Sequence, residues 1–75
     1  MALDTVIQGA GSLYGTNKRD LILGSTASDN LKGGAKDDCL VGGGGNDTLD
    51  GGGGDDVCIG GPGDNTCMNC ERTYE

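Results

Sequence analysis

Five aspartates and one asparagine recur along the chain at intervals of nine residues: Asp20, Asp29, Asp38, Asp47, Asp56 and Asn65. Glycine-rich segments stand between them, such as residues 42–45 and 51–54. Carboxylates and backbone carbonyls are the hard oxygen ligands that Ca²⁺ prefers. Glycine leaves its carbonyl unobstructed by a side chain. These residue types therefore predict calcium sites, provided that the fold brings successive aspartates together.

The aspartates belong to a repeat. Cut every nine residues from Gly15, the chain gives six units without insertion or deletion, ending at Met68. The first position is glycine in every unit, and the sixth is the aspartate or asparagine. The eighth position is apolar throughout: Ile22, Leu31, Leu40, Leu49, Cys58 and Cys67. Three columns kept over six units indicate a repeat architecture.

Each unit divides into a turn and a strand. Its first six positions are rich in Gly, Asn and Asp, which favour turns. Its last three, such as Thr48-Leu49-Asp50, form a short strand whose middle side chain faces inward. Two units return the chain to its starting side, so residues 18 apart are predicted to stack at about 4.8 Å.

The ends of the chain depart from this repeat. We interpret residues 1–14, with Leu3, Val6, Ile7 and Tyr14, as an N-terminal cap, because terminal units of repeat proteins are atypical. Residues 15–68 form the repeats, and residues 69–75 form a C-terminal cap or tail.

The sequence GGGGNDTLD, residues 42–50, matches every defined position of the pattern G-G-x-G-x-D-x-U-x, where U is a large apolar residue. The chain thereby resembles the RTX, or haemolysin-type, calcium-binding repeat proteins over residues 15–68, most strongly over residues 42–63. This resemblance implies an all-β fold, a parallel β-roll or β-solenoid of about three turns built from the six units. It also implies that the turns hold Ca²⁺ along both edges.

Alternate units share an edge, so each candidate site joins residues 18 apart. The pairs are Asp38 with Asp56 on one edge, and Asp29 with Asp47 and Asp47 with Asn65 on the other. Without a cation this stacking places like charges together, which is unfavourable. Asn65 removes a charge and weakens its pair. We expect about 2–4 Ca²⁺ ions, with main-chain ligands from the turn glycines Gly33, Gly34, Gly42, Gly43, Gly45, Gly51, Gly52, Gly54, Gly60, Gly61 and Gly63.

The early units lack glycine at the fourth position, where Lys18, Ala27 and Lys36 stand. Lys18 and Lys36 fall on the edge of Asp20 and Asp38. One interpretation is that a lysine ammonium replaces a metal ion between these aspartates. The other is a decayed repeat with solvated lysines. Both leave the Asp20–Asp38 pair a doubtful calcium site.

Four cysteines in a short chain favour disulfides and an oxidising compartment. Cys58 and Cys67 occupy the inward column, whereas Cys39 is expected to face outward, so a Cys39–Cys58 bond needs a distortion. Four cysteines allow three pairings, which the residues alone leave open. The tail from Cys58 to Glu71 resembles those of short secreted calcium-binding repeat proteins, and this resemblance implies a Cys58–Cys70 bond. A redox motif in CMNC, residues 67–70, and a four-cysteine zinc site are weaker alternatives.

Charge and composition argue against several functions. The net charge of −7 disfavours nucleic acid and anionic membrane surfaces as partners. No apolar segment reaches membrane-spanning length. The chain has no histidine, and its serines have no recognisable base, so we expect no enzyme. The expected function is a secreted structural module that folds, or is stabilised, on binding extracellular Ca²⁺. Without calcium, a flexible acidic linker describes the same composition.

An alternative function uses the outer strand faces. Thr48 and Thr66 alone make a poor ladder for ice or carbohydrate. On the other sheet an apolar outer stripe is predicted to dock a further domain or a second copy, with calcium as an accessory, unless it is merely a set of exposed aliphatic side chains. The stripe consists of Leu21, Val57, Leu23, Val41 and Ile59.

Overall fold

The computed structural model describes residues 4–74, so Leu3 of the predicted cap lies outside the described residues. Within this range the chain forms only short strands: β1 (Thr5–Gln8), β2 (Ser12–Tyr14), β3 (Asp20–Leu23), β4 (Asn30–Lys32), β5 (Cys39–Val41), β6 (Thr48–Asp50), β7 (Val57–Ile59), β8 (Thr66–Met68) and β9 (Arg72–Tyr74). No described segment is a helix capable of spanning a membrane.

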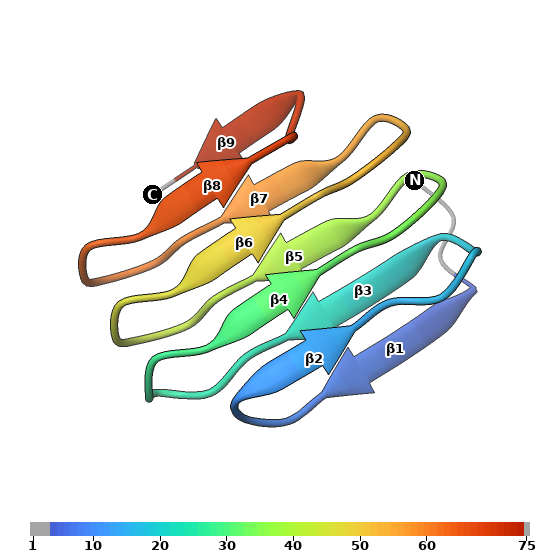
Figure 1. Cartoon of the computed structure of the whole chain (residues 1–75). Coiled ribbons are helices and arrows are strands. Elements are labelled where there is room, and N and C mark those ends of the chain that lie inside the picture. Colours follow the sequence, from blue (N-terminus) through green and yellow to red (C-terminus); the bar gives the residue numbers. More distant parts are fainter. Residues whose placement is uncertain (1–3, 75) are drawn as a thin grey trace.

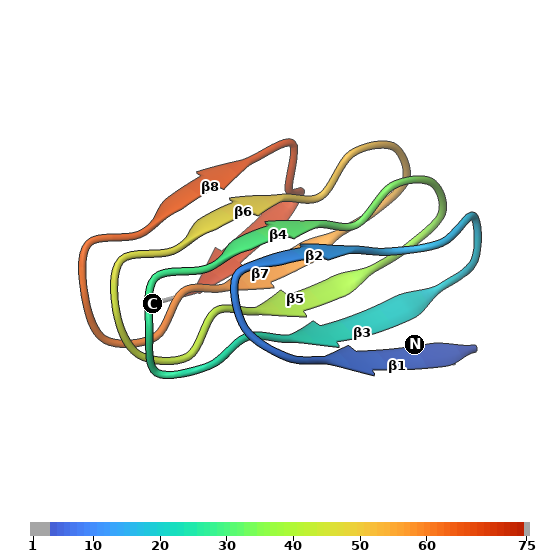
Figure 2. The same ribbon diagram turned by 60° about the horizontal axis from the view of Figure 1, so that its bottom comes forward.

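The strands form two parallel sheets that face each other. One sheet has the order β1-β3-β5-β7-β9 and the other β2-β4-β6-β8 (Figure 1). The chain crosses from one sheet to the other after each strand, so the turns line two opposite edges, as the rotated view makes plain (Figure 2). The fold is the expected all-β parallel β-solenoid, consistent with a β-roll.

The register of the sheets follows the repeat. Leu31 lies opposite Leu49 in one sheet, and Leu40 lies opposite Cys58 in the other, both 18 residues apart. This confirms the predicted stacking. The backbone also links successive turns outside the strands, for example from Thr48 N to Asp29 O at 2.8 Å.

The solenoid has about four turns rather than the predicted three. The difference comes from the ends, because β1 and β2 add a turn before the first unit and β9 extends the last one. Both ends use a shorter offset: Thr5 lies opposite Asp20 and Val57 opposite Arg72, each 15 residues apart. Strand pairing needs only backbone donors and acceptors, so a segment without the repeat can still extend a sheet.

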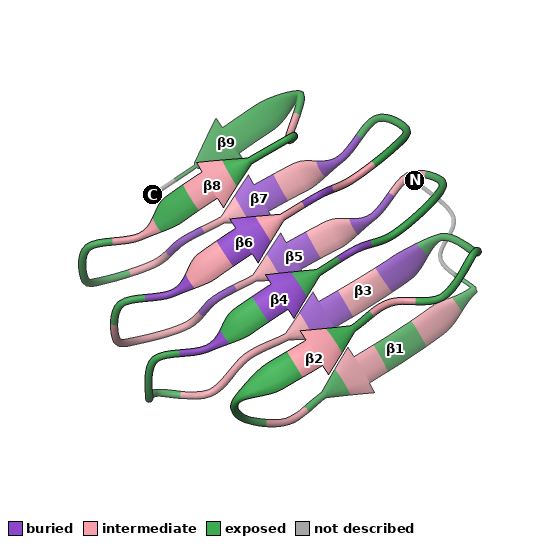
Figure 3. Cartoon of the chain, viewed as in Figure 1, coloured by how far each residue is buried: buried purple, intermediate pink, exposed green. Residues whose placement is uncertain are grey.

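The core is a single file of eighth-position side chains between the sheets. Those of units one to five, Ile22, Leu31, Leu40, Leu49 and Cys58, are fully buried. Ile7, Leu13, Cys67 and Cys70 pack against them at the two ends. Burial follows the alternation of each strand and continues into the turns at the sixth position (Figure 3). The core is therefore flanked on both edges by buried acids.

Candidate metal centre

The sixth-position side chains form a hydrogen-bonded ladder along each edge. On one edge the amide of Asp20 donates to Asp38 Oδ1 at 2.9 Å, and that of Asp38 donates to Asp56 Oδ1 at 2.8 Å. On the other edge the amide of Asp29 donates to Asp47 Oδ1 at 2.8 Å, and that of Asp47 donates to Asn65 Oδ1 at 2.9 Å. The fold thus brings together every pair that the sequence paired.

Three of these aspartates keep one oxygen without a donor. The Oδ2 atoms of Asp38, Asp47 and Asp56 are buried, and no group within residues 4–74 donates a hydrogen bond to them. The residues themselves are 0 to 2 % exposed. A buried polar atom without a partner is costly, and more so when it carries charge. These oxygens mark where something outside the protein chain is needed.

Each unpaired oxygen lies beside a first-position glycine. A Cβ atom on Gly33 would lie 2.6 Å from Asp38 Oδ2 and 2.7 Å from the carbonyl oxygen of Gly51. The carboxylate oxygen and the carbonyl oxygen therefore approach one point from two successive turns. Two acceptors without a donor repel each other, and a hard cation is the partner that suits both.

The glycines at the second and fourth positions hold the turns close together. Gly34, Gly43, Gly52 and Gly61, with Gly45, Gly54 and Gly63, all have φ between 78° and 107°. A Cβ on Gly61 would lie 2.6 Å from the carbonyl oxygen of Gly43, one turn earlier. Within residues 4–74 no three Asp, Glu or Cys side chains gather into a metal-binding group. A cation here must therefore draw on backbone carbonyls, and the four-cysteine zinc alternative has no support.

The electrostatics of the ladder disfavour bare carboxylates. Burial, aided by the charges of Asp56 and Asp20, raises the pKa of the Asp38 carboxyl to about 7. Burial, aided by the charges of Glu71 and Asp37, raises the pKa of Asp56 to about 6. Burial also raises the pKa of Asp47, with the Asp29 charge adding to it. A nearby cation would reverse these effects because it favours the ionised form.

The first two units satisfy their aspartates differently. Asp20 accepts from the amide and the hydroxyl of Thr16 at 2.6 and 2.9 Å. Asp29 accepts from the amide of Ser25 at 2.7 Å and from that of Gly11 at 2.9 Å. Burial of Asp29 favours its neutral form, but these hydrogen bonds outweigh burial and lower its pKa. Asp29 therefore lacks the unpaired oxygen that marks Asp38, Asp47 and Asp56.

The lysines of the early units do not replace a metal ion. Within residues 4–74 no ion pair joins Lys18 or Lys36 to Asp20 or Asp38, and the one ion pair found there is Arg19–Asp4 at 3.2 Å. Thr16 supplies the donors that a lysine was expected to provide. Lys36 instead occupies the left-handed turn position with φ of 70°, which is strained for a residue other than glycine.

The structure joins Cys58 and Cys70 by a disulfide, as the resemblance implied. Cys39 faces outward and is half-buried, and burial raises the pKa of its thiol. The apolar outer stripe also lies in register, with Leu21, Cys39 and Val57 in one column and Leu23, Val41 and Ile59 in the next. Its side chains are only partly exposed.

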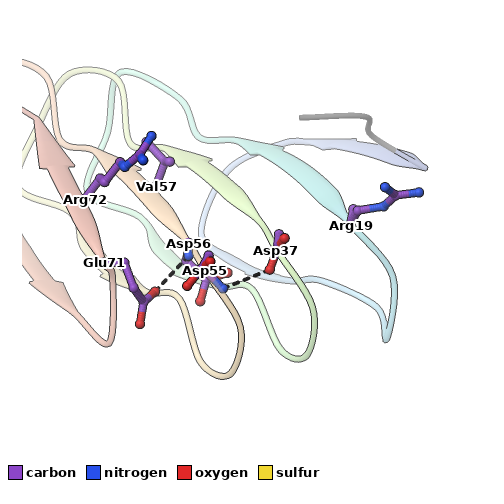
Figure 4. A pocket seen from close by; sticks show the side chains of 7 residues that line it. All are labelled: Arg19, Asp37, Asp55, Asp56, Val57, Glu71 and Arg72. Atoms are coloured by element: carbon purple, nitrogen blue, oxygen red, sulfur yellow. Dashed lines mark hydrogen bonds between the residues drawn. The ribbon is translucent and has the colours of Figure 1, made fainter.

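Sequence analysis missed Glu71, which it left in the tail. Glu71 Oε1 accepts from the amide of Asp56 at 2.8 Å, as a sixth-position aspartate would (Figure 4). It lies 15 residues after Asp56, so a search at the repeat period passes over it. The signal that could have found it is an acid directly before a strand-like segment, Arg72–Tyr74.

A family model described as the RTX calcium-binding nonapeptide repeat (4 copies) matches residues 7–38, 14–47 and 33–67. The overlapping matches together run from residue 7 to residue 67 of the 75-residue chain. No curated protein and no solved structure matches the chain.

Proposed function

The chain belongs to the RTX calcium-binding nonapeptide repeat family, and we propose that it is a structural module whose roll is completed by Ca²⁺ bound in its turns. The unpaired, buried Oδ2 atoms of Asp38, Asp47 and Asp56 carry this proposal. They are the places at which the protein chain alone leaves its own polar groups unsatisfied.

Two sites within the repeats follow from these oxygens. On one edge, Asp38 and the Gly51 carbonyl converge between the third and fifth units, beside Asp56. On the other edge, Asp47 faces the turn that carries Asn65. Bound Ca²⁺ supplies positive charge and accepts oxygen ligands from both turns of each pair. The expected pair of Asp29 with Asp47 is the least suited, because Ser25 and Gly11 already donate to Asp29.

Binding and folding are then one process. The core is one side chain thick, and the turns around it are rich in glycine, which loses much conformational entropy on folding. Metal-binding free energy contributes to folding when the site does not exist in the unfolded chain. The sites form only when residues 18 apart are stacked, so ions that bind there favour the stacked state.

We place the module outside the cell. RTX repeats are typical of secreted proteins, and the Cys58–Cys70 disulfide is suited to an oxidising compartment. Calcium affinities of extracellular modules lie at roughly 10⁻⁴–10⁻³ M, which matches sites built largely from neutral carbonyls.

The test is a calcium titration of the full chain, starting in EDTA, followed by far-UV circular dichroism, with Mg²⁺ in parallel. We expect a gain of β structure that Ca²⁺ produces and Mg²⁺ does not. Mg²⁺ demands a tighter octahedral shell and gives up its waters reluctantly. A complete β spectrum in EDTA that Ca²⁺ leaves unchanged would overturn the proposal.

A matched pair of variants separates a specific site from simple charge. Asp47→Asn removes a buried, unpaired carboxylate, whereas Asp64→Asn removes an exposed one on the same edge. Both raise the net charge by one unit. We expect the first to lose a calcium ion in isothermal titration and the second to keep the wild-type number.

A further inference from the structure

The carboxylate ladder on the edge of Asp38 continues past the last repeat. The amide of Asp20 donates to Asp38, that of Asp38 to Asp56, and that of Asp56 to Glu71. Glu71 thus takes the place of the next sixth-position aspartate. The shortened offset is that of the strand that follows, since Arg72 pairs with Val57.

The same terminal turn also rebuilds the carbonyl side of the cradle. Asn69 follows Gly51 by 18 residues, at the first-position column, and has φ of 54°. A Cβ on Gly51 would lie 2.6 Å from the carbonyl oxygen of Asn69 and 2.7 Å from Asp56 Oδ2. This arrangement repeats that of Gly51 and Asp38 around Gly33. Asp56 Oδ2 is buried and has no donor within residues 4–74.

We propose that Asp56, Glu71 and the carbonyl of Asn69 form a further Ca²⁺ site, which closes this edge beyond the repeats. The inference rests on the proposed function, because it takes calcium as the ion that the turns bind. Glu71 is exposed, and its second carboxylate oxygen has no hydrogen-bond donor among the described residues, so it remains open to a ligand. The site adds a ligand type, glutamate, that the repeats lack at this position.

Protein cations do not neutralise this turn. Arg19 and Arg72 line the same hollow as Asp37, Asp55, Asp56 and Glu71. Figure 4 shows both guanidinium groups directed away from the carboxylates of Asp56 and Glu71. Within residues 4–74 neither arginine forms an ion pair with these two acids, and Arg19 pairs with Asp4. The excess negative charge is therefore available to a cation from solution.

The disulfide holds the terminal site in place. Cys70 directly precedes Glu71, and Cys58 stands two residues after Asp56. Their bond, with a Cα–Cα distance of 6.1 Å, fixes the turn from Asn69 to Glu71 against β7. Reduction releases this turn while leaving the ladders within the repeats intact. The terminal site is thus expected to depend on the disulfide, and the repeat sites are not.

The experiment counts bound Ca²⁺ by isothermal titration for the full chain, for Glu71→Gln and for Asp64→Asn. Glutamine retains an acceptor for the Asp56 amide, so the turn keeps its hydrogen bond, and circular dichroism of the calcium-loaded variant checks the β content. We expect Glu71→Gln to bind one ion fewer and Asp64→Asn to match the wild type. Reduction of the wild type, or Cys58→Ser with Cys70→Ser, is expected to weaken the same ion at least tenfold.

The outcomes separate this inference from the proposed function. If the wild type binds no calcium, the proposed function fails. If the wild type binds calcium and Glu71→Gln binds the same number with the same affinities, only the terminal site is overturned. An equal loss in Asp64→Asn also overturns it, because net charge would then explain the change. A loss confined to Glu71→Gln and to the reduced protein supports both the site and its dependence on the disulfide.

Discussion

Replacing Asp38 by asparagine is expected to stabilise the calcium-free roll while removing a calcium site. The introduced amide would keep an Oδ1 acceptor for the backbone N–H of Asp20 and would present an Nδ2 donor where Asp38 Oδ2 has none. The chain already contains this arrangement in its last unit, where Asn65 Nδ2 donates to the carbonyl of Gly61 at 2.9 Å. The substitution therefore exchanges an unpaired charge for a donor close to an existing carbonyl.

The size of the effect follows from the pKa of Asp38, which is about 7 in the roll against 3.8 for an unperturbed aspartate. Between these values the folded state holds more protons than the unfolded chain, so stability is greatest at low pH and falls as the pH rises through about 7. The full shift corresponds to about 4 kcal/mol, of which about 3 kcal/mol develops between about pH 4.5 and about pH 7.5. That is a large share of the roughly 5–15 kcal/mol that holds a domain together.

The assay is urea unfolding followed by circular dichroism, in EDTA and in excess Ca²⁺, for the wild type and for Asp38→Asn. In EDTA the wild type should lose stability from about pH 4.5 to about pH 7.5, and the variant should lose about 3 kcal/mol less. If the wild type has no transition in neutral EDTA, the β spectrum of the variant supplies the comparison. In Ca²⁺ the order reverses, because the ion binds the ionised carboxylate. An Asp38→Asn variant less stable than the wild type in neutral EDTA would refute the reasoning.

Three further substitutions test the turns. Gly33→Ala places a Cβ 2.6 Å from Asp38 Oδ2 and should cost about 2 kcal/mol and the adjacent calcium ion, whereas Gly53→Ala, with no atom within 4 Å of its Cβ, should change stability by less than about 0.5 kcal/mol in the same urea titrations. Lys36→Gly relieves a φ of 70° and should stabilise the roll by up to about 1 kcal/mol without adding an ion; an added ion in calorimetry would contradict this. Ser25→Gly should weaken the calcium-free roll by about 1–3 kcal/mol and add one ion, and an unchanged ion count would argue against it.

Much of the fold could be predicted because each contact occurs several times. The inward column, the strand positions and the 18-residue register all follow from one period, and the structure confirms them from Leu31 opposite Leu49 to Leu40 opposite Cys58. The pairing of the sixth-position side chains follows from the same period. A repeated sequence is thus a set of repeated measurements of one local geometry.

Features that occur once were harder to predict. β1 and β2 extend the sheets through backbone hydrogen bonds, which leave little trace in side-chain pattern. Glu71 joins the ladder at an offset of 15, which no period of nine or 18 reaches. The lysines were considered for the role of a metal ion because their charge is conspicuous, yet the donors come from Thr16, whose amide and hydroxyl act at short range.

The residue at the second position decides how a sixth-position side chain is satisfied. Thr16 and Ser25 do not adopt positive φ, and their amides point to Asp20 and Asp29. In the last unit, glycine at this position has φ of 78°, and its carbonyl oxygen faces the side chain of Asn65 instead. A glycine thus turns an acceptor toward the site and creates the need for a donor or a cation. A serine or threonine turns a donor toward it and removes that need. The expected demand for calcium therefore rises along the chain with the second glycine of each unit, from the hydroxyl-bearing turns to the terminal turn at Glu71.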